Sequence, residues 1–306
     1  MIRKFETKEI KIISDLHFGR KFRTGVPLDR RGEIEKMIET SFVQELKTIG
    51  DYQVMVIAGD LFDSPFVDTD TIFKVYECLK DNINWIYIIA GNHDLSRDPT
   101  KKTAWDILKE MLSGKSNIKM IKDEPFYDQI RDFLLVPWDC EEKVTEGQMN
   151  KAKFVVGHFE LDSLSKMPKV PNTSLVLSGH YHLPQKNCGI QYVGSILPLT
   201  FGEYDVYRDF EYMRTMSLSE YEEQKESLRN VRVRIRLKKG EELPVGDNVA
   251  LQLVGINDVE ENDISLKLDN ENEDLDMKSI YDKCLSECRR KDEIWFRYIQ
   301  LKGVTD

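Results

Sequence analysis

The sequence contains few cysteines and few histidines, with five of each among its 306 residues. The cysteines are odd in number and form no CxxC pair, which argues against a disulfide scaffold and fits a reducing cytoplasm. Cys284 and Cys288 lie one helical turn apart, but no histidine or further cysteine lies near them, so we interpret them as plain thiols. A disulfide framework is therefore not expected.

The sequence also lacks long apolar runs and an excess of positive charge. No run approaches the roughly 20 apolar residues that a bilayer-spanning helix needs, and the N-terminal MIRKFETKEI lacks the apolar centre and cleavage site of a signal peptide. With 44 basic and 54 acidic residues the net charge is −10, which excludes a globally basic nucleic-acid coat. Any nucleic-acid contact must be local, metal-mediated or shared with a partner. We expect a cytoplasmic protein without membrane contact.

The chain is long enough for about two domains at roughly 150 residues each. Up to about residue 200, short apolar runs alternate with amphipathic helical patterns, which predicts an α/β domain with catalytic loops at the carboxyl ends of the strands. The predicted strands cover residues 10–14, 54–58, 85–90, 133–136, 154–157, 175–178 and 191–193, and the predicted helices cover residues 33–49, 69–80 and 104–112.

The pattern changes after Phe201-Gly202, and we predict a domain of residues 1–205 followed by a smaller α+β domain of residues 206–306. The segment VRVRIRL alternates strictly, which predicts a strand with its arginines on one face and its apolar residues on the other. The remaining predictions are a charged helix over 218–228, strands over 249–254, 264–268 and 294–301, an acidic loop over 269–276 and a helix over 277–290.

Every histidine lies in one of five short motifs, each of which follows a predicted strand. The motifs are Asp15-Leu16-His17, Gly59-Asp60-Leu61-Phe62-Asp63, Gly91-Asn92-His93-Asp94, Gly157-His158 and Gly179-His180-Tyr181-His182. Carboxylate, imidazole and amide oxygen together suit a divalent metal such as manganese, iron or zinc. A single histidine is more often a core residue, but five motifs that use every histidine indicate a metal site.

The motifs supply more candidate ligands than one ion uses. A tetrahedral site takes about four ligands, whereas two ions that share a carboxylate use seven naturally. Such a pair, roughly 3.5–4 Å apart, is suited to in-line displacement at phosphorus. The candidate ligands are Asp15, His17, Asp60, Asn92, His158, His180 and His182.

In this order, the five motifs resemble the signature of the calcineurin-like metallophosphoesterases over about residues 9–200. The resemblance implies a β-sandwich flanked by helices, with a hydroxide between two ions as the nucleophile. It implies that His93 is the general acid or stabilises the phosphorane charge, and that Asp94 either orients His93 or accepts backbone N–H bonds. It assigns Asp15, His17, Asp60 and His182 to one ion, and Asp60, Asn92, His158 and His180 to the other.

Further segments resemble the nuclease subunit of DNA double-strand-break processing complexes, of the bacterial SbcD type and most closely of the phage type. These segments are GDLFDS, VPWDCEE, VVGHFEL, SGHYHLPQ and YVGSILPLTFGE. Asp63 stands where archaeal and eukaryotic members tend to have histidine, as in the bacterial and phage branch. The resemblance implies a DNA exonuclease on double strands and endonuclease on single strands or hairpins. It also implies two divalent ions, Mn²⁺ above all with Mg²⁺, Fe²⁺ or Zn²⁺ as alternatives, and a second domain that caps the DNA.

The resemblance also implies partners: an SbcC-type coiled-coil ABC ATPase and a second copy of the chain, in the host cytoplasm if a phage encodes it. A tail that binds the ATPase would be residues 277–290. In a homodimer the predicted helices 69–80 and 104–112 would pair, with Phe66, Tyr76 and Trp105 as buried aromatics; alternatively, these helix faces pack on their own sheet.

Two groups of basic residues have open interpretations. Arg20, Lys21, Arg23, Arg30 and Arg31 follow the first motif and either neutralise DNA phosphates or form a solvated loop. The row Arg232, Arg234 and Arg236 either faces DNA or is an ordinary water-exposed strand face. A small-molecule phosphodiesterase, for example for cyclic nucleotides, is the alternative enzyme, and a scaffold with a structural metal site is the alternative without catalysis. A protein phosphatase fits less well, because that branch usually has GNHE instead of GNHD.

Overall fold

The computed structural model describes residues 4–50, 53–207, 211–244 and 246–257. These belong to one compact unit, Met1–Asp258, which is separate from a second unit, Val259–Asp306. The predicted strands 264–268 and 294–301, the acidic loop 269–276, the helix 277–290 and Cys284 and Cys288 lie outside the described residues. In the described part of the chain, no helix has the length and apolar content that crossing a bilayer requires.

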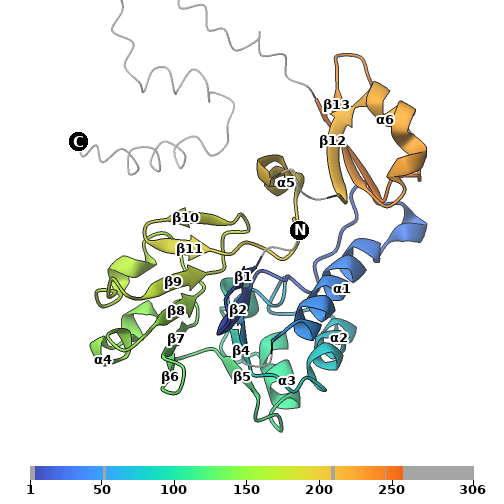
Figure 1. Ribbon diagram of the computed structural model, residues 1–306. Helices are drawn as coiled ribbons and strands as arrows, with labels where there is room; N and C mark the ends of the chain where they lie inside the picture. Colours follow the sequence, from blue (N-terminus) through green and yellow to red (C-terminus); the bar gives the residue numbers. More distant parts are fainter. Residues whose placement is uncertain (1–3, 51–52, 208–210, 245, 258–306) are drawn as a thin grey trace, which may run out of the picture. The chain divides into compact units, whose positions relative to one another are not determined.

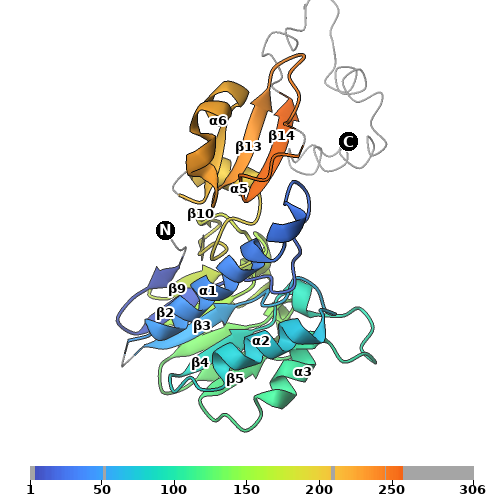
Figure 2. The same cartoon turned by 90° about the vertical axis from the view of Figure 1, so that its right-hand side faces the viewer.

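Two β-sheets form the larger part of this unit (Figures 1 and 2). The first has the order β1 (Phe5–Glu6), β2 (Ile10–Ile13), β3 (Val54–Ala58), β4 (Ile86–Ile89) and β5 (Ile118–Ile121). The second has the order β10 (Gln185–Asn187), β11 (Ile190–Tyr192), β9 (Leu175–Ser178), β8 (Phe154–Gly157), β7 (Phe133–Val136) and β6 (Phe126–Asp128). Only β1, β6 and β10, each at a sheet edge, pair antiparallel. The parallel strands therefore point their carboxyl ends the same way within each sheet.

The two sheets pack face to face, because side chains from both form one apolar cluster that includes Ile12, Val56, Leu135 and Val156. Helices α1 (Glu33–Lys47), α2 (Thr69–Leu79) and α3 (Ala104–Met111) cover the other face of the first sheet, where Phe42 and Trp105 are fully buried. Segments around α4 (Glu146–Met149) cover the outer face of the second sheet (Figure 1). The layers therefore alternate helix, sheet, sheet and helix, an α/β fold of the predicted kind.

Local chemistry explains where the helices begin. Asp68 accepts a hydrogen bond from the Thr71 backbone N–H at 2.8 Å and so caps α2. Thr103 and Asp106 form a reciprocal capping box at the start of α3. A buried ion pair, Lys11 Nζ to Glu45 Oε2 at 2.7 Å, joins β2 to α1. The short 3₁₀ helices are η1 (Leu28–Arg30), η2 (Asn92–Asp94), η3 (Glu141–Lys143), η4 (Ser163–Lys166) and η5 (Lys225–Leu228).

A third, three-stranded parallel sheet follows, in the order β12 (Met213–Ser217), β13 (Arg232–Leu237) and β14 (Gln252–Asn257). Its core includes Tyr221 from α6 (Leu218–Gln224) and Val233 from β13. Helix α5 (Phe201–Tyr207) spans the predicted boundary between residues 205 and 206. The division into two domains at this point remains a prediction.

Candidate metal centre

The candidate ligands follow the carboxyl ends of five strands: β2, β3, β4, β8 and β9. Backbone hydrogen bonds join the loops that leave these ends. The N–H of Asp15 donates to the Gly59 carbonyl at 3.2 Å, and the N–H of His17 donates to the Asp60 carbonyl at 3.0 Å. The Gly179 N–H donates to the Gly157 carbonyl at 3.2 Å. Motifs far apart in the sequence are therefore held at one edge of the sandwich.

Four of the seven candidate ligands have a left-handed backbone conformation, which non-glycine residues rarely adopt. The φ angles are 52° at Asp15, 49° at His17, 49° at Asp60 and 81° at His180. Each such conformation costs about 1–3 kcal/mol and persists only where the surrounding structure imposes it. Strain concentrated in these residues is typical of a functional site.

Glycines allow the loops to approach one another closely. A Cβ atom on Gly59 would lie 2.1 Å from Nδ1 of His158, and one on Gly91 would lie 2.2 Å from Oδ1 of Asp60. Both neighbours are buried, with His158 0% and Asp60 1% exposed. Neither contact could relax toward solvent, so these two positions require glycine.

One group of candidate ligands comprises Asp15, His17 and His182, whose donor atoms lie within 4.8 Å of one another. The two imidazoles face each other, with 3.0 Å between Nε2 of His17 and Nε2 of His182. Nε2 of His17 also lies 3.7 Å from Oδ2 of Asp60. This is the set that the resemblance assigns to one ion.

A second group comprises Asp15, Asp60 and His158. Nε2 of His158 lies 3.3 Å from Oδ2 of Asp60 and 3.0 Å from Oδ1 of Asn92. The same Asn92 oxygen lies 3.2 Å from Nδ1 of His180. Asp15 belongs to both groups, and Oδ2 of Asp60 lies within 3.7 Å of a histidine of each. All seven predicted ligands therefore converge, and the role of Asp60 as the bridging carboxylate stays a prediction.

The chemistry around His158 fits a cation. Its Nδ1 lies 2.9 Å from the Ala58 carbonyl oxygen, so this nitrogen must carry a proton to donate. Without an ion, a second proton on Nε2 satisfies Asp60, in agreement with the raised pKa of His158. In the neutral ring, Nε2 instead presents a lone pair toward Asp60 and Asn92, whose oxygens are also acceptors. A divalent ion among these atoms satisfies all three. The buried Asp and His clusters are thus consistent with a dinuclear metal site.

The residues of this cluster also perturb one another's titration. Burial favours the neutral form, yet the adjacent His158 and His17 keep the pKa of Asp60 well below its usual range. Burial likewise opposes protonation of His158, but the Asp60 carboxylate outweighs it and raises the pKa of His158 to about 9. Burial, together with the charge on His158, lowers the pKa of His180 to about 4. Strong coupling among buried groups is common at functional sites.

Residues 8–184, more than half of the chain, match the calcineurin-like phosphoesterases. The chain belongs to this family. It is 27% identical over 226 residues to Exonuclease subunit 1 of Enterobacteria phage T4, an alignment that covers 65% of this chain and 62% of that protein. It is 26% identical over 224 residues to the DNA double-strand break repair protein Mre11 of Methanocaldococcus jannaschii, covering 64% of this chain and 58% of that protein. The chain therefore spans about three fifths of the length of these two curated relatives.

In this phosphoesterase, His93 lies at the rim of the metal centre. Its ring packs edge-on against His17, with 4.8 Å between ring centroids, and its backbone N–H donates to Oδ1 of Asp60 at 2.9 Å. Its Nδ1 lies 2.7 Å from the Asp63 carbonyl oxygen. Since Nδ1 must donate this bond, Nε2 is the atom left to meet a substrate.

Asp94 takes the second of its two predicted arrangements. Its buried carboxylate accepts backbone N–H groups from Gly91 at 2.9 Å and Phe62 at 2.9 Å, and from Leu61 at 3.3 Å. Burial and the nearby Asp60 charge raise the pKa of Asp94. Asp94 therefore joins the loop before α2 to the loop of His93, and it is the Asp63 carbonyl that holds the His93 ring.

Two carboxylates that were not predicted as site residues lie behind the histidine ligands of the phosphoesterase. Oδ1 of Asp63 lies 3.2 Å from Nδ1 of His17, and Oε1 of Glu203 lies 3.2 Å from Nδ1 of His182. The Trp138 ring packs against the ring of His180, with 5.0 Å between the two centroids. Asp63 lies in the GDxxD motif, Trp138 in VPWDCEE and Glu203 in YVGSILPLTFGE. The spacing of these segments does not indicate which histidine each residue contacts.

Of the five basic residues after the first motif, Lys21, Arg23 and Arg31 border a cleft of about 530 Å³. Arg30 instead pairs with Glu33 and donates to the Val249 carbonyl, so the DNA interpretation is wrong for Arg30. Arg20 lies 3.6 Å from Asp63, Lys21 pairs with Asp68 at 3.1 Å, and Arg23 is exposed. The cleft is lined by the cationic side chains Lys21, Arg23, Arg31, Lys36 and Lys74, and by Glu35 and Glu39. A net positive cleft thus begins close to the metal centre.

The predicted row of three exposed arginines is wrong for Arg232, which is only 4% exposed. Its guanidinium donates to the carbonyls of Pro198 at 2.9 Å and Leu199 at 3.1 Å, so it is not available to DNA. Arg234 is half-buried and pairs with Asp205, whereas Arg236 is exposed. The prediction assumed water on one face of β13, but residues 198–199 cover Arg232.

The aromatic residues predicted for the dimer interface differ in their exposure to solvent. Trp105 is fully buried in the core beneath α3, so it is not an interface residue. Phe66 before α2 is 54% exposed, Phe73 on α2 is 51% exposed, and Ile107 on α3 is 40% exposed. The apolar surface of these two helices therefore consists partly of residues other than those predicted.

Proposed function

We propose that this phosphoesterase is a manganese-dependent DNA nuclease, an exonuclease on double strands and an endonuclease on single strands or hairpins. One observation carries the proposal: seven candidate ligands from five loops converge around Asp60, with His93 beside them at the rim. A purely structural metal site has no need of a histidine held in this way. The names of the two relatives, an exonuclease subunit and a double-strand break repair protein, support DNA as the substrate.

In this proposal two divalent ions are held by the ligand sets described above, one by Asp15, His17, Asp60 and His182, the other by Asp60, Asn92, His158 and His180. Such a pair supplies Lewis-acid activation for in-line displacement at phosphorus. Imidazole ligands suit Fe²⁺ and Zn²⁺, whereas carboxylate and amide oxygens suit Mn²⁺ and Mg²⁺. Among these ions we propose Mn²⁺, because the family resemblance implies it.

His93 serves the leaving oxygen. Its Nδ1 proton is engaged by the Asp63 carbonyl, which fixes the ring. As the doubly protonated imidazolium, His93 would give its Nε2 proton to the departing oxygen and become a neutral ring that keeps the Nδ1 proton. Its backbone N–H contacts Asp60, so the same loop positions the general acid and the shared carboxylate. A misplacement of the ring by about 1 Å can reduce the rate by roughly two orders of magnitude.

The cleft bordered by Lys21, Arg23, Arg31, Lys36 and Lys74 suits a DNA backbone. It lies on the loop that also carries His17, so phosphates bound there would lead toward the ions. With an overall charge of −10, such a local cationic cleft is one of the ways in which this chain could bind DNA. Arg236, which is exposed, remains a candidate DNA contact, and the third sheet a candidate capping domain.

The partners are also proposals. The exposed Phe66, Phe73 and Ile107 support pairing of α2 and α3 with a second copy of the chain. We propose that an SbcC-type coiled-coil ABC ATPase completes the machine and uses ATP to bring DNA ends to the centre. Its predicted docking helix, residues 277–290, lies outside the described residues.

The decisive experiment incubates the purified full-length protein and Mn²⁺ with end-labelled duplex, single-stranded and hairpin DNA, with and without a candidate ATPase. An aryl phosphodiester is tested in parallel. Hydrolysis of the aryl ester with all DNA intact would reject the nuclease and favour a small-molecule phosphodiesterase.

His93→Ser distinguishes an enzyme from a scaffold. We expect this variant to lose roughly 10²–10⁴-fold in cleavage while it still binds Mn²⁺ and DNA, because His93 handles a proton and is not a ligand in this proposal. Asn187→Ser, on the exposed β10, is the control and should cleave normally. Unchanged cleavage by His93→Ser would contradict the assigned role.

A further inference from the structure

A chain of buried polar contacts connects the third sheet to His182. Glu203 is 9% exposed and joins two elements: Oε1 lies 3.2 Å from Nδ1 of His182, and Oε2 accepts the Leu199 N–H at 2.8 Å. The Leu199 carbonyl in turn accepts a bond from Nη2 of Arg232 at 3.1 Å. Only Leu199 lies between the carboxylate that contacts His182 and the guanidinium on β13.

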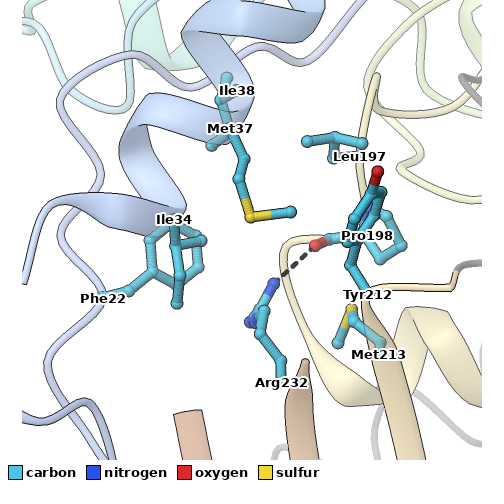
Figure 3. A pocket seen from close by; sticks show the side chains of 9 residues that line it. All are labelled: Phe22, Ile34, Met37, Ile38, Leu197, Pro198, Tyr212, Met213 and Arg232. Atoms are coloured by element: carbon cyan, nitrogen blue, oxygen red, sulfur yellow. Dashed lines mark hydrogen bonds between the residues drawn. The ribbon is translucent and has the colours of Figure 1, made fainter. Parts of the chain in front are cut away.

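Arg232 is held on every side by groups of the protein. Nη1 donates to the Pro198 carbonyl at 2.9 Å, a bond that Figure 3 shows at the edge of a pocket lined by Met37 and Leu197. Nε donates to Oε1 of Gln252 at 2.7 Å. The guanidinium also lies 4.9 Å from the centroid of the Phe22 ring. A planar group with five fixed donors suits this position, and lysine could not make the same set of bonds.

A second connection runs from Gln252 and Leu253 on β14 to the loop that follows His17. Nε2 of Gln252 donates to the Thr24 carbonyl at 2.8 Å, and the Leu253 N–H donates to the Gly25 carbonyl at 2.8 Å. Gly25 has φ +68°, and a Cβ atom there would lie 2.0 Å from the Leu253 carbonyl oxygen. The chain from His17 to Gly25 is thus fixed on β14 at its far end.

The first connection reaches His182, and the second reaches the loop that follows His17. His17 and His182 face each other across 3.0 Å and belong to one predicted ligand set. His158, in the other set, is held by the Ala58 carbonyl within the sandwich. The third sheet therefore contacts the segments that hold His182 and the loop of His17. It does not contact the Ala58 carbonyl, which orients His158.

We propose that Glu203 is a positioning residue for His182, and that the Arg232–Gln252 pair fixes the supports of that ion so that the third sheet controls its affinity. This inference rests on the dinuclear centre of the proposed function. Groups that orient a metal-binding histidine typically change metal affinity by roughly 10–100-fold when removed. The effect should be confined to one of the two ions.

The test is calorimetric titration of the metal-free, full-length protein with Mn²⁺. The wild type should bind two ions, and Glu203→Gln should bind one of them roughly 10–100-fold more weakly, with the other within about threefold of the wild type. Arg232→Met should weaken the same ion. Electron paramagnetic resonance at one equivalent of Mn²⁺ per site should show a coupled pair in the wild type and an isolated ion in Glu203→Gln.

Glu141→Gln is the matched control, because Glu141 is also a buried carboxylate, 6% exposed, but accepts its bond from Ser163. It should bind both ions as the wild type does. Glu203→Asp keeps the charge and serves if Glu203→Gln does not fold, which thermal unfolding in chelator would reveal. It should weaken the same ion, by less.

Equal weakening of both ions, or of neither, would overturn the inference while the dinuclear centre stands. A wild type that binds fewer than two ions would instead refute the proposed function on which the inference rests.

Discussion

Gly91→Ala perturbs the centre through one methyl group. The new Cβ would lie 2.2 Å from Oδ1 and 2.3 Å from the backbone nitrogen of Asp60. Ordinary contact begins near 3.4 Å, so the Asp60 carboxylate or the loop of residue 91 must shift by about 1 Å. The backbone of Gly91 is extended, with φ −96°, so alanine is strained there only by this contact.

The shift should lower the stability of the fold, and it should impair metal binding and cleavage. Overpacking a buried site costs about 1–3 kcal/mol, measurable by thermal unfolding in chelator. Displacing the shared carboxylate by about 1 Å should reduce cleavage by at least roughly 10²-fold, and it should weaken both ions, since Asp60 belongs to both predicted sets. The assays are Mn²⁺ titration and cleavage of end-labelled DNA.

Gly147→Ala separates this effect from the general consequences of replacing glycine. Gly147 lies inside α4, and a Cβ atom there has no neighbour within 4 Å. It should leave metal binding and cleavage unchanged and stabilise the protein by about 0.5–1 kcal/mol. If Gly91→Ala bound two ions as tightly as Gly147→Ala does, the prediction that the added methyl group displaces a ligand shared by both ions would be refuted.

Three further predictions concern stability and assembly. Tyr87→Phe removes a 2.7 Å hydrogen bond to Asp128, a bond that opposes the effect of burial and helps to keep the pKa of Asp128 below its usual value. The carboxylate form of Asp128 accepts this bond, so the variant should lose roughly 1 kcal/mol of unfolding free energy at pH 7. This loss should disappear as the pH falls below about 4 and Asp128 takes up a proton, which denaturant unfolding at neutral and at acidic pH would show. Phe73→Asp should shift a dimer toward monomer in analytical ultracentrifugation, whereas Ile130→Asp, at an 87% exposed site between β6 and β7 of the second sheet, should not. Trp105→Ala should cost about 3–5 kcal/mol in denaturant unfolding, because the side chain is fully buried; a loss below 1 kcal/mol would contradict its place in the core.

The central strands and the three long helices were predictable because each carries a complete local pattern. The predicted strands 54–58, 133–136, 154–157 and 175–178 coincide with β3, β7, β8 and β9, and the three helices end within two residues of their predicted ends. Strands buried on both faces need apolar residues at successive positions, and helices on a sheet need them every three or four. The convergence of the candidate ligands was predictable for the same reason, since they follow these strands directly.

The strands that were missed lie at edges. β10 reads Gln-Lys-Asn and is exposed throughout, and β5 carries Lys119 in the middle of four residues. An edge strand gains its stability from one neighbour and needs little apolar surface, so its sequence resembles a loop. The strand predicted over 249–254 begins three residues later, as β14, and before it the Leu251 N–H already donates to the Val231 carbonyl next to β13.

The supports of the histidines could not be read from any local pattern. Alternation in β13 places arginines opposite valine and isoleucine and implies water on their side, but Arg232 meets carbonyls 33 and 34 residues earlier in the chain. Glu203 contacts His182, which lies 21 residues earlier in the chain. No local sequence pattern predicts that the intervening segment brings these two side chains together. Ligand identity is a property of strand ends, whereas ligand orientation depends on how separate elements pack. We therefore expect that a variant which preserves every motif can still bind one of the two proposed ions more weakly.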